Sequence, residues 1–153
     1  MSRRVWRMVK RMRAAGAFDG EGAQRTGGRW NSPGTPVVYT AEHISLAALE
    51  LLVHLERAAV LDSYVVLPCD LPDSSVETLD RRLLPRHWRT SPAPAELQRL
   101  GDAWARARRS VALEVPSAVV ELEHNVLLNP QHPDFAKVQF GDAFSFAFDP
   151  RLA

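Results

Sequence analysis

The chain has 153 residues, of which 19 are Lys or Arg and 18 are Asp or Glu, so its formal net charge is +1. This length suits one domain spanning residues 1–153, and the near balance of charge gives no overall attraction to nucleic acid or to a membrane surface. No apolar run approaches the roughly 20 residues that cross a bilayer, and the basic N-terminus lacks the apolar centre of a signal peptide, so we expect a cytoplasmic protein.

The first predicted element, residues 3–13, carries six basic side chains and no acidic one. Apolar residues interleave with them, which favours a strand that opens a sheet, or a helical turn followed by a strand. The charges could form an ordinary solvated face or could contact phosphate groups. A phosphate contact would also suit a nucleic-acid-binding protein or a ribonuclease.

Residues 16–28 hold five of the eight glycines, which predicts a turned or mobile loop. No Gly-Lys-Ser/Thr follows, so this is not a Walker loop, and no G-x-G-x-x-G opens a helix. If a nucleotide binds here, the site is therefore not of the Rossmann type. The glycines would instead let the backbone approach a ligand closely.

Residues 27–55 combine a glycine turn, a tight loop at Pro33-Gly34, a short strand over 37–41 and a helix over 46–55 capped by Ser45. Apolar residues surround nearly the whole helix, so we expect it to be buried. Glu50 stands in its middle, where an unpaired carboxylate would be costly. The alternative is a solvated stripe that Glu50 shares with His54 and Arg57.

Residues 64–69 predict a buried strand that ends at Pro68. It contains Cys69, the one cysteine, which we interpret as a small buried hydrophobe because it has no partner for a disulfide or a metal set. Residues 70–94 predict loops and one short helix without a catalytic residue. Residues 94–109 have apolar side chains at helical spacing, which predicts a helix.

Three further strands are expected at 111–115, 125–128 and 142–149. Ser117 follows the first of them, at a strand end where a side chain can face a cleft. The histidines lack metal-binding spacing, so we expect no metal. Short strands with interspersed helices favour an α+β fold over a parallel βαβ array.

These segments resemble the RES domain, the toxin half of bacterial toxin–antitoxin pairs, named for an arginine, a glutamate and a serine. The matching segments are GEGAQRTGGRWNSPGTPVVYTAE, ALELLVH and VPSAVVELEHNVLLNPQHPDF, and the resemblance covers almost the whole chain in the family's order. It places the arginine at Arg29, the glutamate at Glu50 and the serine at Ser117. Tyr39 matches the tyrosine of the central strand, and Asn125 the late asparagine.

The resemblance implies an ADP-ribosyltransferase-like fold with a split, mostly antiparallel β core flanked by helices. It also implies an enzyme that cleaves the nicotinamide–ribose bond of NAD, with NAD as substrate and a helix-turn-helix antitoxin as partner. The catalytic residues that it implies are Glu50, Arg29 and Tyr39. The NAD-binding residues that it implies are Arg7, Arg29, Tyr39, His54, Ser117 and Asn125.

The acceptor of ADP-ribose stays open, since water, phosphate and a target protein all share the cleavage step. Two other classes are also open. A nucleic-acid-binding or ribonuclease toxin would use the basic N-terminus, although no known binding motif is present and we expect no direct contact with nucleic acid. A catalytically silent binding module would keep the fold and lose the chemistry.

Overall fold

The interleaved apolar and basic residues near the N-terminus form strand β1 (Ser2–Lys10) in the computed structural model, which describes residues 1–153. β1 pairs in antiparallel register along its whole length with β3 (Tyr64–Pro72). The other strands are β2 (Val38–Ala41), β4 (Val76–Thr78), β5 (Ala112–Pro116), β6 (His124–Leu128), β7 (Gln139–Phe140) and β8 (Phe144–Phe146). The α-helices are α1 (Glu21–Thr26), α2 (Ile44–Leu52) and α3 (Ala95–Ala107), and short 3-10 turns connect the remaining segments.

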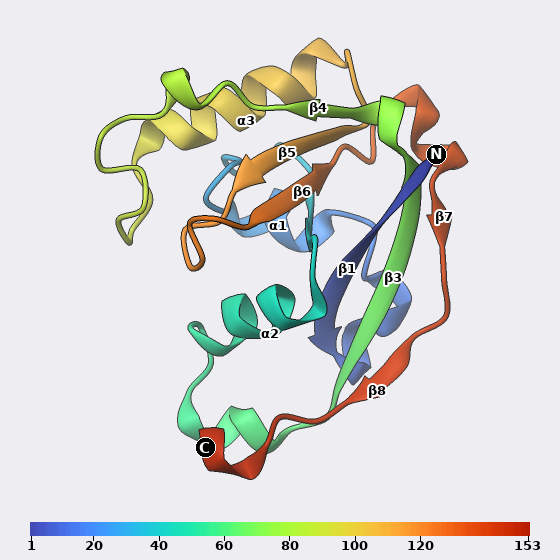
Figure 1. Ribbon diagram of the computed structural model, residues 1–153, viewed down its shortest axis with the longest axis vertical. Coiled ribbons are helices and arrows are strands. Elements are labelled where there is room, and N and C mark those ends of the chain that lie inside the picture. The colour runs from blue at the N-terminus through green and yellow to red at the C-terminus, as the bar shows by residue number, and fades with distance from the viewer.

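The strands form one sheet in the order β4-β5-β6-β2-β1-β3-β7, with β8 also paired to β3. Only the β4–β5 pair is parallel, which confirms the predicted α+β class with a mostly antiparallel sheet. The β1–β2 junction rests on a single register pair, Trp6 with Ala41. The sheet therefore divides there into two halves, which diverge in Figure 1, with α3 over the upper half and α2 beside the lower one.

Helix α3 lies on the β5–β6 half through a core that includes Trp30, Leu97, Trp104 and Leu127. Gly101 allows this approach, because a Cβ at that position would lie 1.6 Å from the carbonyl oxygen of Trp30. The helix thus presses directly on the turn that carries Arg29.

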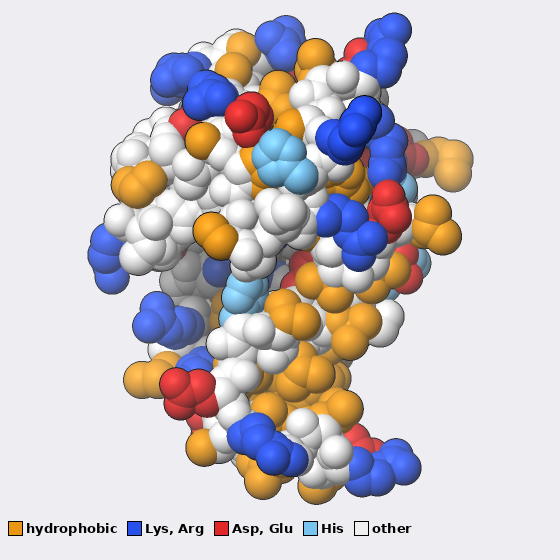
Figure 2. Space-filling view, turned by 90° about the vertical axis from the view of Figure 1, so that its left-hand side faces the viewer, with side chains coloured by type: hydrophobic (Ala, Val, Ile, Leu, Met, Phe, Trp, Pro, Cys, Tyr) orange, Lys and Arg blue, Asp and Glu red, His pale blue; other side chains and the backbone are white.

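Helix α2 differs from the prediction at both ends. It begins after His43, which is its N-cap without a side-chain hydrogen bond, so Ser45 is not the cap. Leu46 is buried against the sheet, but Leu49 is 42% exposed and Val53, just past the helix, is 61% exposed. The expectation of burial on all sides was therefore wrong. Hydrophobic side chains gather on the lower half of the face shown in Figure 2.

Three other segments depart from the prediction. Residues 16–28 contain helix α1, which the glycine content concealed. Strand β3 runs through Pro68 to Pro72, and the predicted strand over 142–149 shortens to β8. The interpretation of Cys69 is confirmed, since it is fully buried and burial raises the pKa of its thiol to about 12.

Candidate functional site

The turn that carries Arg29 is held in place by helix α3. The side-chain amide of Gln98 donates to the carbonyl oxygens of Gly28 (3.0 Å) and Asn31 (3.1 Å). The carboxylate of Asp102 accepts from both the backbone N–H (3.0 Å) and the hydroxyl of Ser32. These bonds fix both ends of the turn, so the orientation of Arg29 follows from the packing of α3.

Tyr39 on β2 supports the same turn from the other side. Its hydroxyl accepts from the backbone N–H of Trp30 (3.0 Å) and donates to Oδ1 of Asn31 (2.6 Å). Burial is the main cause that raises the pKa of Tyr39, so the phenol stays neutral. The hydroxyl already donates its proton to the turn, so the ring is the part of Tyr39 that can contact a ligand.

Glu50 projects from α2 onto the ends of β5 and β6. Its Oε1 accepts from the hydroxyl of Ser117 (2.8 Å), and its Oε2 accepts from the side-chain amide of Asn125 (2.6 Å). Burial raises the pKa of Glu50, while these two hydrogen bonds and the charges of His54 and Arg29 act to lower it. Glu50, Ser117 and Asn125 thus come together from three separate elements.

Arg29 holds a loop through one nitrogen of its guanidinium. Its Nη1 donates to the carbonyl oxygens of Trp88 (2.9 Å) and Thr90 (3.0 Å), while Nη2 and Nε have no hydrogen-bond partner. Burial lowers the pKa of Arg29, and the field of Glu50 acts against that shift. The free Nη2 and Nε can donate hydrogen bonds to an anionic ligand.

Arg89 is a supporting residue that the sequence did not reveal. It lies in the loop that Arg29 holds, and its Nε donates to the carbonyl oxygen of Ala118 (3.0 Å). Its Nη1 donates to the carboxylate of Glu121 (3.3 Å). Arg89 thereby ties this loop to the turn that follows Ser117. The sequence carries no signal for it, because its partners lie about thirty residues further along the chain.

Arg7 stands apart from this group. Its Nη1 donates to the backbone carbonyl of Tyr39 (2.9 Å), and its buried Nε has no partner. Burial lowers its pKa, and Asp19 is the charged group that acts against that shift. The guanidinium therefore bridges the two halves of the sheet next to their junction. His54 is exposed one turn after Glu50.

Three of the six N-terminal basic side chains form ion pairs within the protein. Arg3 contacts Glu114 (2.5 Å) and Asp73 (3.4 Å). Arg4 contacts Asp70 at 2.8 Å, and Lys10 contacts Asp62 at 3.7 Å. These carboxylates reduce the positive field that contact with nucleic acid would need.

Two groups of acidic and histidine side chains have ligand atoms within 4.8 Å of one another: Glu42, His43 and Glu123, and Glu42, Glu114 and His124. Glu42 already accepts from the backbone N–H of His124 (2.9 Å), and Glu114 is paired with Arg3. The arginine charge beside the second group disfavours a cation there. The absence of a metal stays a prediction.

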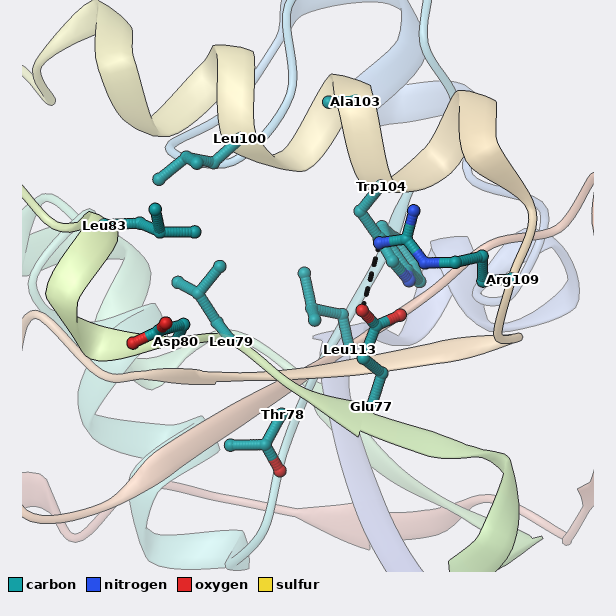
Figure 3. Close-up of a pocket in the computed structure, with 10 residues that line it drawn as sticks. All are labelled: Glu77, Thr78, Leu79, Asp80, Leu83, Leu100, Ala103, Trp104, Arg109 and Leu113. Carbon is teal, nitrogen blue, oxygen red and sulfur yellow. Dashed lines mark hydrogen bonds and ion pairs between the residues drawn. The ribbon is translucent and has the colours of Figure 1, made fainter.

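An apolar cavity of about 260 Å³ lies between α3 and the segment that follows β4 (Figure 3). Leu79, Leu83 and Leu100 point into it, and the ion pair between Glu77 and Arg109 closes one end. None of the candidate site residues lines this cavity. It is therefore separate from the group around Glu50. In the space-filling view, the surface is hollowed between the upper and lower halves of the molecule (Figure 2).

The RES domain family model matches residues 4–149. "Toxin Res" of Yersinia enterocolitica is 39% identical over 149 residues, which cover 97% of this chain and 98% of that protein. "Prs ADP-ribosylating toxin" of Sphingobium sp. is 35% identical over 157 residues, which cover 99% of this chain and 98% of that protein.

The fold is similar to that of a chain in the crystal structure of the M. tuberculosis MbcT-MbcA toxin-antitoxin complex. The TM-score is 0.74 at 24% identity, over 99% of this chain and 87% of that chain. None of the helices has the length and apolarity needed to cross a bilayer.

Proposed function

Because the chain belongs to the RES-domain family of toxins from toxin–antitoxin systems, we propose that it cleaves the nicotinamide–ribose bond of NAD and passes ADP-ribose to an acceptor. The Glu50 carboxylate carries this proposal, since it is partly buried and receives one hydrogen bond on each oxygen. A carboxylate fixed in this way can stabilise the positive charge that develops on the ribose as nicotinamide leaves.

The proposed reaction needs only NAD and the acceptor. The ribosyl C–N bond breaks, and nicotinamide keeps the electron pair. The acceptor then donates an electron pair to the same carbon and releases a proton. The residues need only bind the dinucleotide, orient its ribose and stabilise the transient cation.

The free Nη2 and Nε of Arg29 are suited to the diphosphate, because a guanidinium can donate two parallel hydrogen bonds to phosphate oxygens. The ring of Tyr39 would stack on or orient the nicotinamide ribose. NAD-binding roles for Arg7 and His54 stay predictions. Arg7 has a buried Nε without a partner, which gives it a free donor near the sheet junction.

The acceptor divides the proposal into three products. Water gives free ADP-ribose, phosphate gives ADP-ribose phosphate, and a protein side chain gives a modified protein. The Sphingobium relative is a Prs ADP-ribosylating toxin, which supports transfer to a protein. A cognate antitoxin is the expected partner, because the structural neighbour was crystallised as a toxin–antitoxin complex.

The test is incubation of the purified protein with NAD, followed by mass spectrometry of the small molecules and of added lysate proteins. Release of nicotinamide by the wild type and its loss in Glu50→Gln, with an unchanged far-UV CD spectrum, is the expected result. Glu56→Gln is the matched control, since Glu56 is exposed and lies outside the site. If wild type and Glu50→Gln release nicotinamide at the same rate, Glu50 is not the catalytic carboxylate. If neither releases any, the proposed reaction is wrong for this chain.

A further inference from the structure

We propose that Ser117 and Asn125 are positioning residues, which hold the carboxylate of Glu50 in one orientation. Both residues donate hydrogen bonds to this carboxylate rather than to NAD. This inference rests on the proposed NAD cleavage only for its kinetic test. It differs from the role that the family resemblance implies for the two residues, which is direct contact with the dinucleotide.

The hydroxyl of Ser117 has no donor left for a ligand. A hydroxyl has one proton to donate and two lone pairs to accept with. The backbone N–H groups of Val119 and Val120 both donate to this oxygen at 3.1 Å. Its single proton points at Oε1 of Glu50, 2.8 Å away, and the residue is fully buried. A turn of the backbone thus fixes the direction in which Ser117 donates.

The side-chain amide of Asn125 is committed in the same way. Its Nδ2 has two protons, and it donates to the carbonyl oxygen of Thr40 (3.2 Å) and to Oε2 of Glu50 (2.6 Å). Asn125 is 9% exposed. Each oxygen of the carboxylate therefore receives one buried donor. The plane of the carboxylate is set by the turn after β5 and by β6, and not by the helix that carries Glu50.

These two donors also affect the ionisation of Glu50. The charged groups that act on it are His54 on its own helix and Arg29 on the facing turn, and both favour the ionised form. Burial acts in the opposite direction and is the largest effect, so that the pKa of Glu50 is raised. Loss of either donor raises it further, because hydrogen bonds to the ionised form favour that form. Only the ionised form can stabilise a cation on ribose.

The test is the pH profile of kcat/KM for Ser117→Ala, whose acidic limb reports the ionisation of the free enzyme. We expect the limb to move to higher pH by about one unit, the size expected for the loss of one hydrogen bond to a charged group. KM for NAD should change less than about twofold at a pH where Glu50 is ionised in both proteins, because a residue that acts only through Glu50 contributes no uniform binding of NAD. Asn125→Asp should move the limb in the same direction, because it replaces the second donor with a carboxylate.

Ser110→Ala is the matched control. Ser110 also donates to a glutamate, Glu77 (2.9 Å), and accepts from the indole N–H of Trp104 (2.9 Å). Both of these partners line the cavity of Figure 3 and not the group around Glu50. Its loss should leave the acidic limb in place.

A direct readout needs no catalysis. The carboxyl ¹³C shift of Glu50, titrated in the protein without NAD, should show a higher pKa in Ser117→Ala than in the wild type. Unchanged titration of Glu50 would mean that Ser117 does not act on the carboxylate, and a raised KM with an unmoved acidic limb would mean that Ser117 contacts NAD. Either result would show that the positioning role is wrong. If the wild type leaves NAD intact while the titration shifts as expected, the proposed reaction fails and the positioning role stands.

Discussion

At the scale of single residues, the site is a carboxylate whose surroundings act in opposite directions. Burial raises the pKa of Glu50, while Ser117, Asn125, His54 and Arg29 act to lower it. The sequence could single out Glu50, because a charge in an apolar helix stands out. It could not show what holds that charge, since Ser117 and Asn125 lie 67 and 75 residues further along the chain.

The raised pKa predicts a pH-dependent stability difference between the wild type and Glu50→Gln. The wild type gains stability from Glu50 below the ordinary carboxyl pKa and loses it as the pH rises through the higher pKa of the folded state. The amide does not titrate, so the melting temperature of Glu50→Gln relative to wild type should increase from acid to neutral pH, by about 2–4 °C per kcal/mol. Thermal denaturation across this pH range measures it. A difference that stays constant with pH would show that Glu50 is not desolvated.

Arg29 should contribute to NAD binding and also hold the loop that contains Trp88 and Thr90. Arg29→Ala should raise KM for NAD by about tenfold or more, because a charge-assisted diphosphate contact of about 1.5–3 kcal/mol acts in both the ground and the transition state. Arg29→Lys should recover little, because a point charge cannot hold the Trp88 and Thr90 carbonyls and also donate a second pair of bonds. Steady-state kinetics measure both variants. Arg25→Ala is the control, since Arg25 is exposed on α1. Unchanged KM and kcat in Arg29→Ala would make the residue purely structural.

At the scale of elements, the sequence predicted most strands and α3 because their apolar spacing is regular. It failed where side-chain packing between distant segments decides the outcome. Helix α1 forms within a glycine-rich segment because Asn31 donates to the carbonyl of Ala23 (2.8 Å) and Gly34 to that of Gln24 (2.7 Å). Helix α2 leaves Leu49 exposed, and helical spacing alone cannot show which side of an apolar helix meets the sheet.

The contact between α3 and the Arg29 turn predicts that Gly101→Ala is strongly destabilising. The added Cβ would meet the backbone carbonyl of Trp30 at 1.6 Å, so the helix must move off the turn. We expect a loss of about 1–3 kcal/mol or more in the free energy of unfolding. Urea denaturation measures it, with Gly22→Ala as the matched control, because nothing lies within 4 Å of a Cβ at Gly22. Equal stability of the two variants would mean that α3 does not press on the turn.

At the scale of the whole molecule, the near-neutral charge and the ion pairs of Arg3 and Arg4 favour a small-molecule substrate over nucleic acid. The family was recognisable from the sequence because its motifs are spread in order along the chain. The resemblance implied a split β core, but it did not place the split at Trp6 and Ala41, because no local pattern marks where strand pairing stops.

Membership of a toxin family predicts the behaviour of the chain in cells. Expression of the wild type without a partner should stop bacterial growth within a few generations, and Glu50→Gln should be tolerated. Co-expression of the cognate helix-turn-helix antitoxin should restore growth. Growth curves with parallel measurement of cellular NAD test this. A steep fall in NAD before arrest supports hydrolysis or phosphorolysis, and arrest with NAD nearly intact supports transfer to a protein. Harmless wild-type expression at high level would contradict the toxin activity of this chain.

The single register pair between the two halves of the sheet affects how the protein should respond to warming. Helix α2 packs mainly on the half that contains β1, in one cluster with Met8 and Tyr64, and less on β2. Ser117 and Asn125 belong to the other half. We expect warming to separate the two halves at this junction before either half loses its secondary structure, which would free the Glu50 carboxylate. Inactivation of the proposed reaction on warming should therefore precede melting.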